Sequence, residues 1–123
     1  MTIDELKKIL LEVYSKETAH PDWQDKWSKE NPTCGQCVPT ALLVQYYFGG
    51  DICRHNIESH YFNVINNHVV DLTKEQFDYD LDYSNSVVKQ PDQNKANVKE
   101  RFELLKDKVE EYVRKFIDKE ISR

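Results

Sequence analysis

Three side chains in the middle of the chain have the chemistry of a catalytic triad: Cys37, His60 and Asp71. A cysteine attacks a carbonyl carbon as its thiolate, and a neighbouring imidazole can hold the thiol proton and later pass it to the leaving group. A carboxylate bonded to that imidazole fixes its tautomer and stabilises its cation. These types, in this order, predict a cysteine-dependent amide hydrolase or acyltransferase that acts on a peptide or small amide and uses no cofactor or metal.

Cys37 is expected at the first turn of a buried helix. Pro39 fits only into a first helical turn, where its missing N–H would be unpaired in any case. The run from Ala41 to Phe48 is almost wholly apolar, and Gly49-Gly50 provides a left-handed stop. Unpaired backbone N–H groups and the helix dipole favour a thiolate at this end of a helix, and the same N–H groups could hold an oxyanion.

A β-hairpin is expected to bring the imidazole and the carboxylate together. Two β-rich runs flank Asn66-Asn67, and asparagine tolerates the positive φ that a tight hairpin turn needs. With these two residues as the loop, His60 and Asp71 become diagonal neighbours on one face of the hairpin. Asn63 and His68 fall outside this face. The register therefore selects Asp71 as the partner of His60.

Three further residues are candidates for an oxyanion site or for the wall of a cleft. Gln36 and Asn31 are close to Cys37 in the sequence and carry amide donors. Trp27 follows Trp23 by four residues, so both are expected on one face of a short helical segment. One interpretation is that both tryptophans anchor the core. The other is that one of them, Trp27, forms a wall of the cleft beside the Cys37 thiol.

The rest of the chain predicts helices before and after a small sheet. Thr2-Ile3-Asp4-Glu5 is a capping-box pattern, and the helix that follows is expected to run to about Lys16. Apolar residues at alternating steps of four and three predict a long helix from about Ala96 to Lys119. The stretch Asp51 to Glu58 is expected to connect the cysteine helix to the sheet. The fold class is therefore α+β, with the cysteine helix packed on a small antiparallel sheet.

The order Cys37, His60, Asp71 resembles the papain-like and transglutaminase-like superfamily, in which a helix bearing Cys packs on an antiparallel sheet bearing His and then Asp or Asn. A second set of motifs spans more of the chain: Asn31-Pro32-Thr33, Gly35-Gln36-Cys37, Thr40-Ala41-Leu42, Gly49-Gly50, Ser59-His60-Tyr61-Phe62-Asn63, Asp71-Leu72-Thr73, Gln76-Phe77 and, more weakly, Arg101-Phe102-Glu103-Leu104-Leu105. On these segments the chain resembles the YunG-like family of small bacterial proteins more closely, and this resemblance implies the same fold and candidate site. Cys34 and Pro39 differ from that family's pattern.

Length and composition narrow the possible classes. A chain of 123 residues is expected to form a single domain, residues 1–123. A formal charge of −5 argues against nucleic acid or an anionic membrane as the main partner. No apolar run reaches the length of a membrane span, and three cysteines cannot all pair within one chain. These features predict a cytoplasmic protein that is a monomer, or a weak homodimer through the far end of the last helix.

Two other classes of function stay open beside the thiol enzyme. One is a non-catalytic binding module on the same fold. The other is a small zinc or thiol-redox protein, because Cys34 and Cys37 form a C-x-x-C pair and Cys53 and His55 could complete four zinc ligands. A thiol enzyme is preferred, since the redox interpretation leaves His60 and Asp71 without a role.

Overall fold

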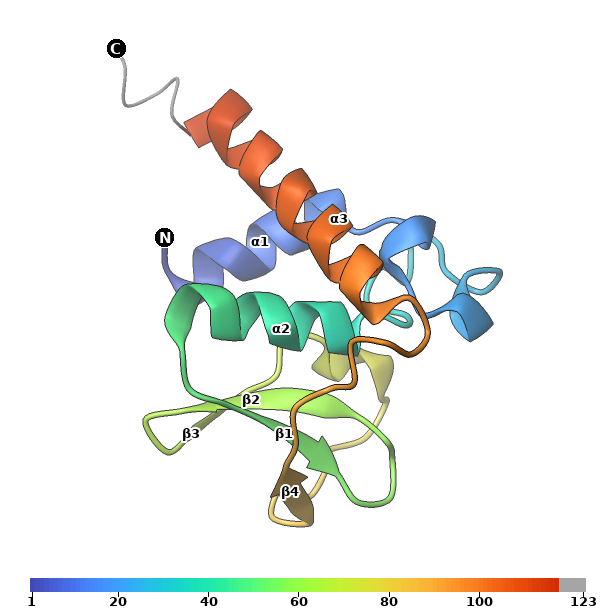
Figure 1. The fold of residues 1–123 in the computed structure, drawn as a ribbon, viewed down its shortest axis with the longest axis vertical. Coiled ribbons are helices and arrows are strands. Elements are labelled where there is room, and N and C mark those ends of the chain that lie inside the picture. Colours follow the sequence, from blue (N-terminus) through green and yellow to red (C-terminus); the bar gives the residue numbers. More distant parts are fainter. Residues whose placement is uncertain (118–123) are drawn as a thin grey trace.

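The computed structural model describes residues 1–117 and shows an α+β architecture (Figure 1). Three α-helices and a four-stranded antiparallel sheet make up this part of the chain, with the strand order β3-β2-β1-β4. The elements are α1 (Ile3–Val13), α2 (Cys37–Phe48), β1 (Asp51–His55), β2 (Tyr61–Ile65), β3 (His68–Val70), β4 (Ser86–Val88) and α3 (Val98–Tyr112). Short 3₁₀ turns cover Lys16–Thr18, Pro21–Trp23 and Lys74–Gln76.

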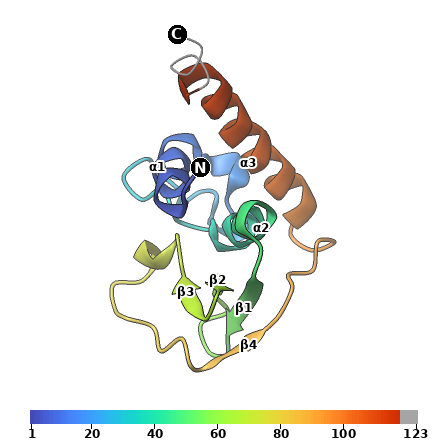
Figure 2. The same cartoon turned by 90° about the vertical axis from the view of Figure 1, so that its left-hand side faces the viewer.

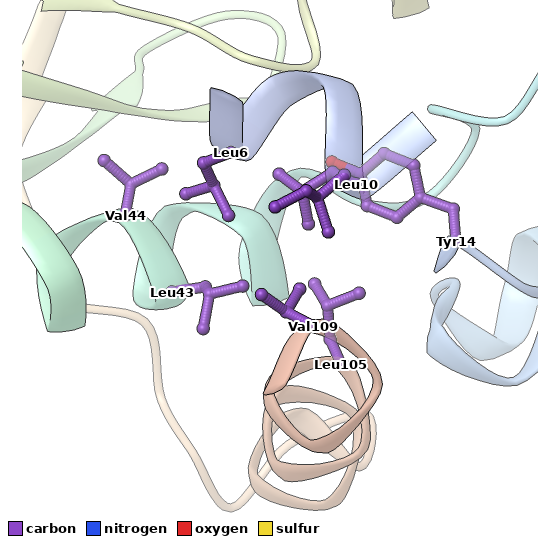
Figure 3. Close-up of a cluster of buried hydrophobic side chains, with 8 residues drawn as sticks. Leu6, Leu10, Tyr14, Leu43, Val44, Leu105 and Val109 are labelled. Atoms are coloured by element: carbon purple, nitrogen blue, oxygen red, sulfur yellow. The ribbon is translucent and has the colours of Figure 1, made fainter. Parts of the chain in front are cut away.

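Helix α2 forms the middle layer of the fold. Figures 1 and 2 show α1 and α3 on one side of it and the sheet on the other. Because both sides are covered, the apolar sequence of α2 is buried along most of its length. Figure 3 shows the core that the three helices share, built from Leu6, Leu10, Tyr14, Leu43, Val44, Leu105 and Val109.

The capping box predicted at the start of the chain is confirmed. The Thr2 hydroxyl accepts a hydrogen bond from the Glu5 N–H at 3.0 Å, and the Glu5 carboxylate accepts one from the Thr2 N–H at 3.1 Å. These bonds begin α1, which ends at Val13 rather than at about Lys16. The difference arises because Tyr14 leaves the helix with a ψ of 142° and turns its ring into the core.

Thr2→Ala is expected to lower the free energy of unfolding by about 1 kcal/mol, since it removes the side-chain acceptor for an N–H that has no partner within the helix. Urea unfolding monitored by circular dichroism measures the change. Glu12→Ala is the matched control, because Glu12 is exposed on the same helix outside the cap. Equal losses in the two variants would contradict the capping contribution.

The predicted hairpin is confirmed in its loop and in its register. Asn66 and Asn67 have φ values of 50° and 66°, and Ile65 pairs with His68 across the turn. The ladder ends where Asn63 pairs with Val70. The predicted pairs Phe62–Asp71 and His60–Thr73 lie beyond the ladder, and a side-chain hydrogen bond between His60 and Asp71 links the two segments there.

The stretch predicted as a connection, Asp51 to Glu58, is instead mostly a strand. β1 lies inside the sheet between β2 and β4, with Cys53 opposite Phe62 on one side and opposite Val88 on the other. Gly49 and Gly50 turn the chain sharply enough for the strand to start directly after α2, with no crossing segment. The prediction of a connecting segment was wrong because Asp51 and Arg54 make this short stretch look polar, whereas β1 lies inside the sheet.

Helix α3 carries the predicted apolar stripe but starts later than predicted. Ala96 and Asn97 have positive φ values, so helical geometry begins at Val98. After Tyr112 the chain continues as a wider π-type turn over Val113–Ile117. The predicted end at Lys119 lies outside the described residues.

Candidate active site

Cys37 is the first residue of α2, as the sequence predicts. The preceding residue, Gln36, is the N-cap and uses no side-chain hydrogen bond for capping. The thiol is a free, partly exposed cysteine on the wall of a pocket of about 790 Å³. Its position at the end of the helix gives it the positive pole of the dipole and an entry route for a ligand.

A tight turn at Gly35 sets the position of this helix start. Gly35 has a φ of +70°, and its carbonyl accepts a hydrogen bond from the His20 N–H at 2.9 Å. A Cβ at this position would lie 3.0 Å from the His20 nitrogen and 3.1 Å from the Trp23 Cβ. Only glycine therefore allows the turn before Cys37 to pack so closely against residues 19–23.

His60 lies immediately before β2 and is almost completely buried. Its ring packs edge-on against Phe77, with 4.9 Å between the ring centroids, and stacks at a greater distance on Phe62. The Nε2 atom is 2.7 Å from the Asp71 Oδ2 atom. The hairpin register therefore identified the correct partner, because Asn63 instead donates to the Ala41 carbonyl and His68 is exposed.

Asp71 is held in place by donors other than His60. Its Oδ1 accepts hydrogen bonds from the Thr73 N–H and hydroxyl, and its Oδ2 also accepts one from the Tyr83 hydroxyl at 2.9 Å. Burial and the charge of Asp71 raise the pKa of Tyr83, which keeps the phenol protonated and donating. Tyr83 was not identified from the sequence, because it comes from a separate loop.

The surroundings of His60 favour its cation. Burial, the largest influence, lowers its pKa, but the hydrogen bond to Asp71, the nearby Cys37 sulfur and the charges of both groups outweigh burial and raise the pKa to about 9. The Nδ1 atom is buried and has no partner with good hydrogen-bond geometry. Since Nε2 is bonded to Asp71, Nδ1 is the nitrogen available to exchange a proton with the Cys37 thiol.

The other predicted site residues are divided between the pocket and the core. Asn31 lines the pocket with Cys37 and His60. Gln36 does not, because it is fully buried and its amide donates to the Ser15 carbonyl at 3.0 Å. The placement of Trp27 at the cleft is wrong: its indole donates to the Pro32 carbonyl and packs on the helical core. Trp23 lines the pocket in its place.

Tyr83→Phe is expected to lower the free energy of unfolding by about 1–3 kcal/mol, because it leaves a buried carboxylate with one donor fewer. Tyr79→Phe is the matched control. Its hydroxyl also donates to a carboxylate, that of Glu58, but at an exposed position, so a change within about 0.5 kcal/mol is expected. Chemical denaturation of both variants measures the difference. Equal losses would show that Tyr83 does not support Asp71.

The residues named for the zinc alternative do not gather in one place. In residues 1–117, no three His, Cys, Asp or Glu side chains form a group that could hold a metal ion. His55 uses Nδ1 to accept hydrogen bonds from the N–H groups of Ile57 and Glu58. Burial raises the pKa of Cys34, so that thiol stays protonated more readily than an ordinary one.

In residues 1–117, every helix is too short or too polar to cross a membrane.

Comparison with known proteins identifies the family. No solved structure matches the chain. A Bacillus subtilis (strain 168) protein named "Uncharacterized protein YunG" is 37% identical over 83 residues, which cover 66% of this chain and 68% of that protein. The family model described as YunG protein matches residues 2–114. The resemblance to the YunG-like family seen in the sequence is confirmed, and the chain belongs to the YunG family.

Proposed function

We propose that this protein is a cysteine-dependent amide hydrolase or acyltransferase in which Cys37 is the nucleophile, His60 the general base and acid, and Asp71 the residue that orients His60. The observation that carries the proposal is the buried imidazole of His60, bonded to Asp71 through Nε2 and next to the Cys37 thiol with Nδ1 free. A structural histidine in a core normally has both nitrogens satisfied. One committed and one free nitrogen is the arrangement that proton transfer requires.

The proposed reaction has two steps. The Cys37 sulfur attacks the carbonyl carbon of the amide, and the electrons of the C–O double bond move to the oxygen. When the tetrahedral intermediate collapses, the C–N bond breaks and His60 gives its proton to the leaving amine, which leaves a thioester on Cys37. Water or an acceptor amine, deprotonated by His60, then attacks the thioester and releases the thiol. The backbone N–H of Cys37 and the amide of Asn31 are the candidate donors to the oxyanion.

The arrangement of elements also supports the papain-like and transglutaminase-like interpretation. The cysteine opens a helix, the histidine precedes the first strand of a hairpin, and the acid follows the second strand. This order places Cys37 and His60 on the wall of one pocket, with Asp71 bonded to His60 from the end of the neighbouring strand. We propose that the YunG fold uses this geometry for acyl transfer.

A thioester on Cys37 is the direct test of the proposal. The protein is incubated with an activated acyl ester and examined by intact-mass and peptide mass spectrometry. We expect one acyl group on Cys37 that hydroxylamine removes, much less in His60→Ala, and none in Cys37→Ala. Cys53→Ala is the control, since Cys53 is buried in β1 away from the pocket wall. Equal acylation of Cys37 with and without His60 would refute the triad and favour a binding module.

A further inference from the structure

Arg101 is a buried arginine without an acidic partner. It lies in the first turn of α3 and is only 4% exposed. Buried guanidinium groups are normally paired with a carboxylate, because an unpaired charge in a protein interior is costly. Among residues 1–117, no aspartate or glutamate forms an ion pair with it. Its charge is therefore not neutralised within the described part of the protein.

Two main-chain carbonyls hold the guanidinium in a fixed orientation. Nε donates to the Ala96 carbonyl at 3.0 Å and Nη1 donates to the Thr18 carbonyl at 3.3 Å. Nη2 is buried and has no partner. Carbonyls orient the group but carry no full negative charge, so the site keeps both a net positive charge and an unused donor.

Arg101, which carries this unused donor, lines the pocket that contains Cys37. Figures 1 and 2 show the N-terminal ends of α2 and α3 side by side. Burial lowers the pKa of Arg101, and the Cys37 charge acts against this, so the two groups are within electrostatic reach. Burial and then the charge of Arg101 lower the pKa of His20, another wall residue. The positive charge of Arg101 therefore acts on two other residues of the pocket wall, Cys37 and His20.

The acidic residues that line the pocket do not neutralise the charge of Arg101. Asp22, Glu58 and Asp92 all line the pocket, yet none forms an ion pair with Arg101. The side chain of Asp22 is largely exposed, and a Glu58 oxygen accepts the Tyr79 hydroxyl. An anion that enters the pocket would therefore meet no acid already bound to the guanidinium.

We propose that Nη2 of Arg101 binds a carboxylate of the substrate, and that the substrate is an amide carrying this carboxylate close to the bond that Cys37 attacks. The inference rests on the proposed function, since it names the substrate class of the same site. A carboxylate fits better than a phosphate, because one free guanidinium nitrogen offers one charge and few donors. A substrate with a carboxylate would pair the buried guanidinium of Arg101, whereas a substrate without one would leave it unpaired. This difference in free energy would select for the carboxylate.

Charged and neutral alkylating reagents of one size test this inference. Iodoacetate carries a carboxylate, whereas iodoacetamide does not, and both alkylate a thiolate by the same displacement of iodide. We expect Arg101→Gln to lower the rate with iodoacetate about tenfold relative to the rate with iodoacetamide. The charge of His60 is present in both proteins and cancels in this ratio. Arg54→Gln is the control, because Arg54 lines the same pocket but is more exposed and donates to Ser59.

An equal fall in both rates would overturn the inference and assign Arg101 to stabilising the Cys37 thiolate. No change in either rate would also overturn it. A measurement on the unmodified protein guards against a variant that fails to fold: propionate should protect Cys37 from iodoacetamide in a saturable way, whereas propionamide should not. Equal protection by the two compounds, or none by either, would contradict a carboxylate site.

Failure of the proposed function can be told apart from failure of this inference. Propionate is titrated into the Cys37→Ala protein and followed by the NMR signals of the arginine side chains. If propionate shifts the Arg101 signal while Cys37 of the unmodified protein reacts like an ordinary thiol, the carboxylate site stands without the enzyme. If Cys37 is activated but propionate has no effect on Arg101, the enzyme proposal stands and the substrate class is wrong.

Discussion

Replacing His60 by alanine is expected to convert the alkylation of Cys37 from a nearly pH-independent reaction into one whose rate rises tenfold with each pH unit. In the native protein the pKa of His60 is raised to about 9, so its cation persists throughout the neutral range, and in the proposed mechanism this cation stabilises the Cys37 thiolate. Without the cation, the thiol must ionise unaided. Rates with iodoacetamide between pH 5 and 8 measure the change.

The size of the effect follows from the ionised fraction. An ordinary thiol, with a pKa of about 8.5, is ionised to only ~0.03% at pH 5. A stabilised thiolate is intrinsically less nucleophilic, which offsets part of the gain from full ionisation. At pH 5 we therefore expect His60→Ala to lower the rate by about 10- to 100-fold, equivalent to about 1.4–2.7 kcal/mol of activation free energy.

The controls are an exposed histidine and the two other cysteines, none of which belongs to the proposed triad. His68→Ala removes an exposed histidine of the same hairpin and should leave the pH profile flat. Cys34 and Cys53 are buried thiols whose pKa values burial raises, so their contribution is subtracted with variants in which they are replaced. A steep profile in the unmodified protein, or a flat one in His60→Ala, would remove His60 from the mechanism.

Sequence signals that act over a few residues predicted the parts of the candidate site that depend on local backbone structure. The Asn66-Asn67 turn sets the register of the hairpin, and a register with period two fixes which residues can face His60. Pro39 and the glycines after Phe48 define the ends of α2 through backbone sterics alone. These restraints operate over a few residues, which is why Cys37, His60 and Asp71 could be named without a structure.

The parts that were missed depend on contacts between distant segments. Trp23 rather than Trp27 lines the pocket because the chain around Pro21 forms a 3₁₀ turn instead of a regular helix, which changes the side that each indole faces. Tyr83 reaches Asp71 from a loop whose path no periodicity predicts. A sequence signal for Arg101 did exist: it falls on the buried stripe of α3, three residues after Val98 and four before Leu105. An arginine at such a position indicates either a paired ion or a binding site.

The buried His60–Asp71 pair links the proposed chemistry to stability. The side chains of His60 and Asp71 are 1% and 3% exposed, so solvent screens their interaction weakly. The same hydrogen bond that would orient His60 for catalysis must therefore also make folding depend on pH. Stability measurements can detect the ion pair without any knowledge of the substrate.

Between pH 6 and 9.5 the unmodified protein is expected to lose about 3 kcal/mol of stability through His60. The pKa of His60 is about 9 in the folded protein and about 6.5 when unfolded. Below pH 6.5 both states are protonated and the stabilisation is fully present; as the pH rises towards 9, the unfolded state has already lost its proton and the advantage disappears. Urea unfolding at several pH values measures this loss, at about 1.4 kcal/mol for each unit of difference in pKa.

Asp71→Asn isolates the pair from the other titrating groups. The amide keeps the size of the side chain but carries no charge, so burial, which lowers the pKa of His60, is no longer outweighed by the carboxylate. We expect this variant to be less stable than the unmodified protein at pH 6 and to lose much less stability on the way to pH 9.5. Parallel stability curves for the two proteins would mean that His60 is neutral beside Asp71. A neutral His60 could not supply the cation that holds the Cys37 thiolate, so the same result would also count against the triad.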